Sequence, residues 1–235
     1  AAVDDPAPQV RLEAVRALAA IGGPQAAELA FHAVDHERDA SLDYCVWLTA
    51  RDLRDAWLPA VVAGTFADGG KPARVIFAAR AAEAQAAVPW LVARVQDGGL
   101  SPADRQAALE AIAALGGPAD LRLVFDRAIE PATKPAQAAA WLTLLVETEG
   151  RRRVRPAGDL AAVARLLESP DPAVVTTAIN ACAAWKLKAA IGPLAVLAHD
   201  AAQPQAQRRA AIGALGGLPG DEARAALVAL ASGSE

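Results

Sequence analysis

The sequence repeats one local unit, in which an apolar helical stripe ends at a glycine pair followed by proline. The run RLEAVRALAAIGGP from Arg11 to Pro24 returns as RQAALEAIAALGGP from Arg105 to Pro118. Glycine adopts the positive φ at which many helices end, and proline suits the first turn of the next helix because no N–H partner is needed there. We therefore expect each unit to form a helix, a tight turn and a second helix.

The first unit shows this pattern most completely. Asp5 is expected to cap its first helix, with Pro6 in the first turn. Gly22 and Gly23 are expected to take the left-handed conformation that closes that helix. Pro24 then opens the second helix with its φ already set. In a later unit, Ser101 and Asp104 resemble a capping box with aspartate in place of glutamate.

Units of this kind follow one another along the whole chain. Their expected starts, spaced by about 30–37 residues as in helical-repeat arrays, are Pro6, Asp39, Pro72, Pro102, Pro135, Pro172 and Pro204. One hairpin cannot bury its apolar face alone, whereas stacked hairpins share a continuous core. We predict an all-α fold, an α-solenoid of about seven helical hairpins that forms a single domain over residues 1–235, with a frayed polar tail at 232–235.

Composition favours closely packed helices over one large core. Hydrophobic residues make up 54% of the 235 residues, but aromatic residues make up only 4%. Much of the apolar content is alanine, which is the best helix former and lets helix axes approach closely. No β-branched run with the period of a strand appears, so no sheet is predicted.

Charge and apolar runs limit the expected partners. The net charge of −4 lacks the basic excess typical of nucleic-acid binding, and no uncharged apolar run reaches the roughly 18 residues of a membrane span.

Cys45 and Cys182 lie in helical apolar stripes and are expected to be buried free thiols. The chain starts with alanine and has no methionine, so we expect a processed chain or a segment of a longer one.

The first helix carries a family resemblance. It combines Asp-Pro at residues 5–6, Val-Arg at 10–11, alanine at 14 and Ala-Leu at 17–18. This pattern resembles the bacterial HEAT-like repeat of the PBS-lyase type, and Asp171-Pro-Ala-Val174 is similar in the sixth unit. The resemblance implies a fold, the HEAT-type α-solenoid, and no particular activity.

The stretch Val10–Ala60 carries a narrower resemblance. Its runs VRLEAVRA from Val10, LDY from Leu42, WLT from Trp47 and WLP from Trp57 are similar to the HEAT segment of multidomain proteins of planctomycete-type bacteria. There the segment lies between a sugar-dehydrogenase-like β-propeller and a c-type cytochrome domain. The resemblance implies an exported, periplasmic protein in which this chain is a spacer or docking arm; the alternative is a cytoplasmic protein. The sequence has no Cys-x-x-Cys-His motif, so no cofactor is expected.

One polar and aromatic cluster is the main candidate for an interaction patch. It contains Asp43, Tyr44, Trp47, Arg51 and Asp52, of which Tyr44, Trp47 and Arg51 share one helical stripe. Tyrosine, tryptophan and arginine dominate the hot spots of protein interfaces. The alternative is that Tyr44 and Trp47 only fill space between neighbouring hairpins, while Arg51 pairs with a carboxylate.

A basic run forms the second candidate. Arg151, Arg152 and Arg153 are followed by Arg155, in what is predicted to be a long turn after a helix that ends at Glu147. Such runs are usually solvated loops. The alternative is a docking point for an anionic partner or for a phosphate backbone.

His32 and His36 are four residues apart and would share a helix face, as a pair of metal ligands can. We prefer a different interpretation, in which both lie at a helix C-terminus, where a partly protonated imidazole complements the helix dipole. No metal site is therefore expected.

The sequence also lacks a phosphate-binding loop, a nucleophile elbow and a Cys-x-x-Cys pair, so we expect a chain that is not an enzyme.

Together these features predict an interaction scaffold that binds a protein or adjacent domains of the same parent chain. We expect it to be a monomer. The expected binding surface is the concave one, formed by the second helix of each hairpin. The alternative is a DNA-binding enzyme of the HEAT-like alkylpurine glycosylase type, in which Trp47, Trp57, Trp90, Trp141 and Trp185 would offer stacking surfaces. The negative net charge argues against it.

Overall fold

The computed structural model describes residues 2–233, and these residues form helices and turns with no strand among them. The chain divides into two compact units, Ala1–Gly116 and Gly117–Glu235. Their boundary falls in the turn of the fourth predicted hairpin. The all-α helical-repeat class predicted from the sequence is confirmed. No helix in the described part of the chain combines the length and the apolar character that crossing a membrane requires.

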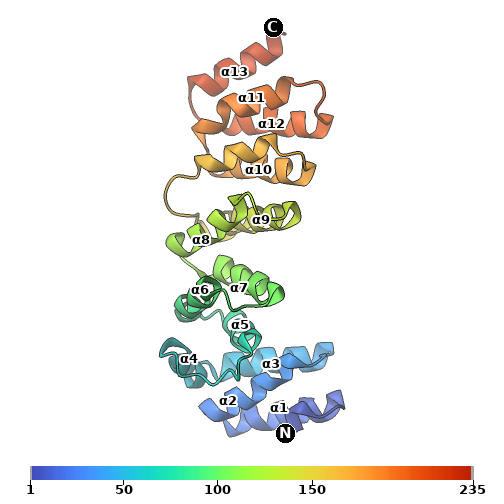
Figure 1. Ribbon diagram of the computed structural model, residues 1–235, viewed down its shortest axis with the longest axis vertical. Helices are drawn as coiled ribbons and strands as arrows, with labels where there is room; N and C mark the ends of the chain where they lie inside the picture. The colour runs from blue at the N-terminus through green and yellow to red at the C-terminus, as the bar shows by residue number, and fades with distance from the viewer. Residues whose placement is uncertain (1, 234–235) are drawn as a thin grey trace. The chain divides into compact units, whose positions relative to one another are not determined.

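Unit 1 stacks its hairpins in two layers (Figure 1). Its elements are η1 (Ala2–Asp4), α1 (Pro8–Ile21), α2 (Pro24–Ala30), η2 (Phe31–Asp35), α3 (Ala40–Asp52), α4 (Arg54–Val62), α5 (Pro72–Ala81), η3 (Gln85–Ala87), α6 (Val88–Asp97) and α7 (Pro102–Leu115). Helices α1, α3, α5 and α7 pack in sequence and form the first-helix layer. Helices α2, α4 and α6 form the second-helix layer behind it.

Unit 2 repeats the two-layer packing. Its elements are α8 (Pro118–Ile129), α9 (Pro135–Arg152), η4 (Ala161–Glu168), α10 (Pro172–Ala184), η5 (Lys188–Ala190), α11 (Ile191–His199), α12 (Gln205–Gly217) and α13 (Asp221–Ser232). Helices α9, α10 and α12 contact one another in turn, and α8, η4, α11 and α13 form the opposite layer. Ser232 ends α13 and Gly233 caps it with left-handed backbone; residues 234–235 of the predicted tail lie outside the described residues.

The start of α1 differs from the prediction. The helix begins at Pro8 rather than Pro6, and its N-cap is Ala7, in extended backbone. The reason is that a residue before proline is disfavoured from helical backbone, so Ala7 cannot belong to the helix. Asp5 instead accepts the N–H of Ala7 at 2.9 Å, in a turn that precedes the helix.

The turn between α1 and α2 follows the predicted chemistry in part. Gly22 and Gly23 have φ of 76° and 85°, values that glycine adopts at little cost, and Pro24 opens α2 as predicted. Their ψ values of −180° and 169° are extended rather than left-handed helical. The chain therefore reverses through two extended glycines, because Pro24 also disfavours helical backbone at the residue before it.

Small side chains fill most of the core of each unit, and a few aromatic rings occupy its wider places. In unit 1, Trp57 is fully buried and donates its indole N–H to the Ala50 carbonyl at 2.8 Å. Its ring meets Phe31 edge-on at 5.8 Å, a favoured aromatic geometry. In unit 2, Phe125 and Trp185 make the corresponding edge contact at 5.8 Å.

Buried guanidinium groups connect the hairpins of unit 1. Arg74 on α5 has a side chain only 9% exposed and forms an ion pair of 2.6 Å with Asp35 at the end of η2. This contact joins the third hairpin to the first. Arg11 on α1 is 5% exposed and donates to the backbone carbonyl of Glu37 at 2.6 Å, which joins the first hairpin to the second.

We expect Arg74→Ala to destabilise unit 1, because it leaves the partly buried Asp35 carboxylate without its cation. The expected loss is about 2–4 kcal/mol of unfolding free energy, measured by urea denaturation. Arg80→Ala is the matched control. Its pair with Glu110 has side chains 50% and 36% exposed, so its loss should stay below about 1 kcal/mol. Equal losses for the two variants would contradict this account.

The two cysteines should differ in reactivity. Burial raises the pKa of Cys182 to about 12, and burial also raises the pKa of the half-buried Cys45. Because the thiolate is the reactive form, less than about one Cys182 in a thousand is reactive at pH 8. Iodoacetamide at pH 8, followed by mass spectrometry, should label Cys45 first and Cys182 only after unfolding. Labelling of Cys182 at the Cys45 rate in the native protein would disprove this.

Candidate interaction site

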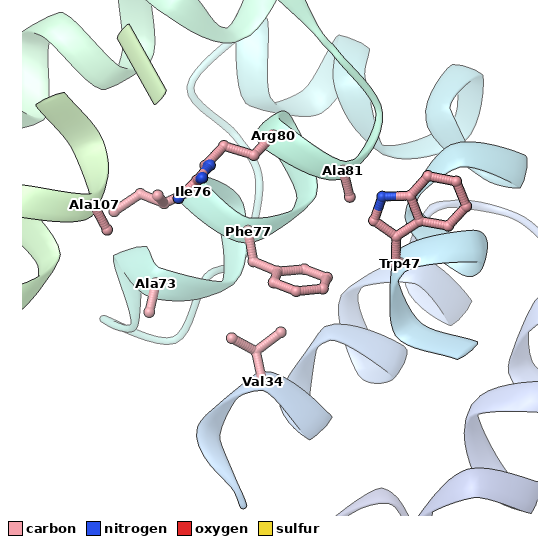
Figure 2. A pocket seen from close by; sticks show the side chains of 8 residues that line it. All are labelled: Val34, Trp47, Ala73, Ile76, Phe77, Arg80, Ala81 and Ala107. Carbon is pink, nitrogen blue, oxygen red and sulfur yellow. The ribbon is translucent and has the colours of Figure 1, made fainter. Parts of the chain in front are cut away.

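A hollow of about 470 Å³ opens on the first-helix layer of unit 1. Four consecutive hairpins contribute to it, through η2, α3, α5 and α7. Its lining residues are Val34, Trp47, Ala73, Ile76, Phe77, Arg80, Ala81 and Ala107 (Figure 2). The lining is therefore mainly apolar, with a single guanidinium among the described residues that form it.

Helix α5 supplies most of the lining because its residues on this side follow helical spacing. Ala73, Ile76, Phe77, Arg80 and Ala81 lie at positions i, i+3, i+4, i+7 and i+8, which form one stripe of a helix. Figure 2 shows the Phe77 ring on the side of Val34 and Trp47, while Arg80 extends along Ile76 toward Ala107. The opposite side of α5 is buried in the core.

The three residues of the predicted stripe on α3 contact one another, and Trp47 among them lines the hollow. Tyr44 and Trp47 stack with ring centroids 5.7 Å apart and planes at 19°, and the Arg51 guanidinium lies 4.7 Å from the centre of the Trp47 ring. Arg51 also donates to the Ala81 carbonyl at 3.0 Å and to Glu83 at 3.3 Å. The carboxylate pairing of the alternative interpretation is thus present, although Tyr44 remains 62% exposed.

Asp43 contributes to the hollow through a neighbour. It forms an ion pair of 2.8 Å with Arg38. Arg38 also donates a hydrogen bond to the Val34 carbonyl at 2.7 Å. The same guanidinium lies 5.1 Å from the centre of the Phe77 ring, at a distance typical of cation–π contact. Asp43 therefore orients Arg38 over an aromatic residue that lines the hollow.

The sequence placed the binding surface on the second helices, whereas this hollow lies on the first-helix layer. The second-helix layer of unit 1 has a smaller hollow of about 280 Å³, lined in part by Val62 and Trp90. Sequence reasoning included Val34 in the expected binding surface but missed Phe77 and Arg80. The available signal for these two was the i, i+3, i+4, i+7 spacing along α5, which predicts one helix face without saying that part of that face stays open.

The basic run lies in unit 2 and is not the loop that was predicted. Helix α9 continues past Glu147 to Arg152, and Arg153 caps it with left-handed backbone. Arg151 pairs with Glu147 one turn earlier, because lysine or arginine four residues after glutamate favours helix continuation. Arg151 and Arg152 are thus helical, and the side chain of Arg151 remains 74% exposed.

The histidine pair converges on a carboxylate. His36 Nε2 and His32 Nδ1 lie 3.2 Å and 3.7 Å from the same oxygen of Asp4 in η1. The hydrogen bond from His36 lowers the pKa of the Asp4 carboxyl. Within residues 2–233, no group of three or more histidine, cysteine or acidic side chains has the arrangement of a metal site. The cluster holds η1 against η2.

The tryptophans do not form the stacking surface that the glycosylase alternative needs. Trp57, Trp141 and Trp185 are 0%, 6% and 2% exposed, so three of the five rings belong to the core. Trp47 and Trp90 remain partly open, each beneath an arginine guanidinium.

Unit 2 has hollows of its own. One of about 480 Å³ and one of about 520 Å³ share Val196 and Asp200. Val196 is 71% exposed, and the backbone N–H of Ala202 lowers the pKa of Asp200. Within the described part of the chain, no phenylalanine, tyrosine or tryptophan lines either hollow, whereas Trp47 and Phe77 line the hollow of unit 1.

Comparison with known families supports the repeat type in the first hairpin. Residues 10–29 match the family model described as the PBS lyase HEAT-like repeat, which confirms the HEAT-like resemblance there. No curated protein matches the chain. Among solved structures, human deoxyhypusine hydroxylase in complex with glycerol is similar at 19% identity and a TM-score of 0.39, over 100% of this chain and 88% of that one.

The expectation that the chain is not an enzyme is corrected. A similar solved structure is that of a hydroxylase, so the claim that the chain is not an enzyme is not supported. At that TM-score the similarity assigns no reaction to this chain.

Trp47 is interpreted either as part of an interaction patch or as a residue that only fills space between hairpins. The two interpretations predict different losses of unfolding free energy when Trp47 is replaced by alanine. Trp57→Ala removes a fully buried ring and its hydrogen bond to Ala50, with an expected loss of about 3–5 kcal/mol. Trp47→Ala removes a ring that is only partly buried, so its loss should be smaller than that of Trp57→Ala. Thermal and urea unfolding measure both. A Trp47 loss as large as that of Trp57 would favour a purely space-filling role.

Proposed function

We propose that unit 1 is a binding module that holds a protein segment in the hollow of its first-helix layer. The observation that carries the proposal is the row of Tyr44, Trp47 and Arg51 at the edge of a mainly apolar hollow. These three residue types supply most hot-spot energy at protein interfaces. Tyr44 is largely exposed, so part of the row is available to a partner.

The dimensions of the hollow favour side chains of a partner. Its volume of about 470 Å³ lies within the range of about 300–1,000 Å³ of ligand pockets and exceeds that of any single side chain. A flat apolar patch would gain less, because a side chain that enters a concave site loses more of its contact with water. A partner segment with one or two large apolar side chains fits this space.

Trp47 already has the surroundings of an anchor site. Stacking on Tyr44 and the cation–π contact with Arg51 hold its ring in one orientation. A ring held in place before binding loses little rotamer entropy when a partner arrives. The cluster is therefore suited to binding as well as to packing between α3 and α5.

A random peptide library displayed on phage tests the proposal. Selection on the wild-type chain should yield peptides whose binding falls at least about tenfold on Trp47→Ala, measured by fluorescence anisotropy. Trp90→Ala is the matched control, since Trp90 also lies half-buried beneath an arginine, at 5.0 Å from Arg94, but on the second-helix layer. Peptides that depend on Trp90 and not on Trp47 would move the binding surface to the second helices.

The resemblance of residues 10–60 supports a narrower proposal, that the chain is the spacer or docking segment of a larger exported redox protein. The supporting observation is the set of sequence runs in α1, α3 and α4 that carry the resemblance. The test is the complete reading frame: a β-propeller before this stretch and a Cys-x-x-Cys-His domain after it are expected. A reading frame with neither would end this proposal and leave the binding proposal intact.

A further inference from the structure

One guanidinium group lines the hollow of unit 1, and two more lie against aromatic rings that line it. Arg80 lines it directly, Arg38 lies over Phe77 and Arg51 lies over Trp47. Each also forms an ion pair with a carboxylate that does not line the hollow; these carboxylates are Asp43, Glu83 and Glu110. Arg80 therefore places a guanidinium in the lining of the hollow, and Arg38 and Arg51 each lie against an aromatic ring that lines it.

These arginines retain hydrogen-bond donors. Arginine has five N–H groups, but in the described part of the chain both hydrogen bonds of Arg51 come from Nη1. Arg80 likewise bonds through Nη1 alone, and Arg38 uses Nε and Nη1. The Nη2 groups of all three, and Nε of Arg51 and Arg80, make no hydrogen bond within the described residues.

The existing ion pairs do not prevent a second carboxylate from binding. The pairs of Arg51 and Arg80 have side chains 36–75% exposed, and pairs of that exposure contribute at most about 1 kcal/mol each. A guanidinium with two free donors can accept a further carboxylate in the forked geometry that such pairs prefer. The hollow thus combines an apolar floor with unused donors at its edge.

We propose that the segment bound in this hollow is acidic as well as apolar. This inference rests on the proposed binding function and specifies its partner. A large aliphatic or aromatic side chain occupies the space between Val34, Phe77 and Trp47. Aspartate or glutamate residues on its two sides accept hydrogen bonds from the free donors of Arg51 and Arg80.

A polyanion such as nucleic acid is the less favoured occupant. Its closely spaced phosphates would meet the same arginines together with their partners Asp43, Glu83 and Glu110. The net charge of −4 repels any acidic partner, but it repels a nucleic acid, which carries a charge on every nucleotide, more strongly than a peptide with a few carboxylates. The apolar lining of the hollow would gain nothing from a phosphate.

The peptides selected on the wild-type chain provide the test. Among those lost on Trp47→Ala, we expect aspartate and glutamate to be enriched beside a leucine, phenylalanine or tryptophan. A synthetic peptide of the most frequent sequence should bind about 5–20-fold more weakly to Arg80→Gln, and more weakly in 300 mM than in 50 mM NaCl. Arg94→Gln is the matched control and should leave the affinity unchanged, because Arg94 lies beside Trp90 on the other layer.

The outcomes separate this inference from the binding proposal. Trp47-dependent peptides without acidic enrichment, or with unchanged affinity for Arg80→Gln, would overturn the acidic partner and leave the binding function standing. A library that yields no Trp47-dependent peptide would overturn both. Stronger competition by a 12-nucleotide single-stranded DNA than by the selected acidic peptide would replace the peptide with a nucleic acid.

Discussion

Hydrogen bonds from the starts of the first-layer helices to neighbouring hairpins are the constraint on which the rest of the structure depends. Arg11, Arg74 and Gln207 occupy the third or fourth position of α1, α5 and α12 and are at most 8% exposed. Their partners are the Glu37 carbonyl, the Asp35 carboxylate and the Pro172 carbonyl. Alanine packing is non-directional and would tolerate sliding, whereas a buried donor without its partner costs about 1–3 kcal/mol. These contacts therefore fix the register of the hairpins that they join.

The hollow of unit 1 follows from that register. With Arg74 tied to Asp35, the rotation of α5 is fixed, and its stripe from Ala73 to Ala81 faces the space between α3 and α7. The bond from Arg51 to the Ala81 carbonyl then fixes the far end of α5 against α3. Small residues at Ala73, Ala81 and Ala107 leave the space open, because larger side chains there would fill it.

The sequence predicted the repeat, the helix order and the shared stripe of Tyr44, Trp47 and Arg51, since these depend on local spacing and on proline and glycine chemistry. The start of α1 differs from the prediction because Pro8 disfavours helical backbone at Ala7, so Asp5 cannot cap the helix. The end of α9 differs because the pairing of Glu147 with Arg151 extends the helix through the run of arginines. The hollow was out of reach, since it depends on how four hairpins align rather than on any one of them.

The four-hairpin origin of the hollow has a mechanical consequence. Its lining residues come from four successive hairpins, so the spacing between the hairpins sets its width. A slight stretching or compression of unit 1 along its stack would shift each hairpin a little relative to the next. Because these shifts add, the distance from Val34 to Ala107 would change more than the distance between adjacent helices. The fit of anything held there thus varies with tension along the array, and an occupant that spans several hairpins stiffens the array in return.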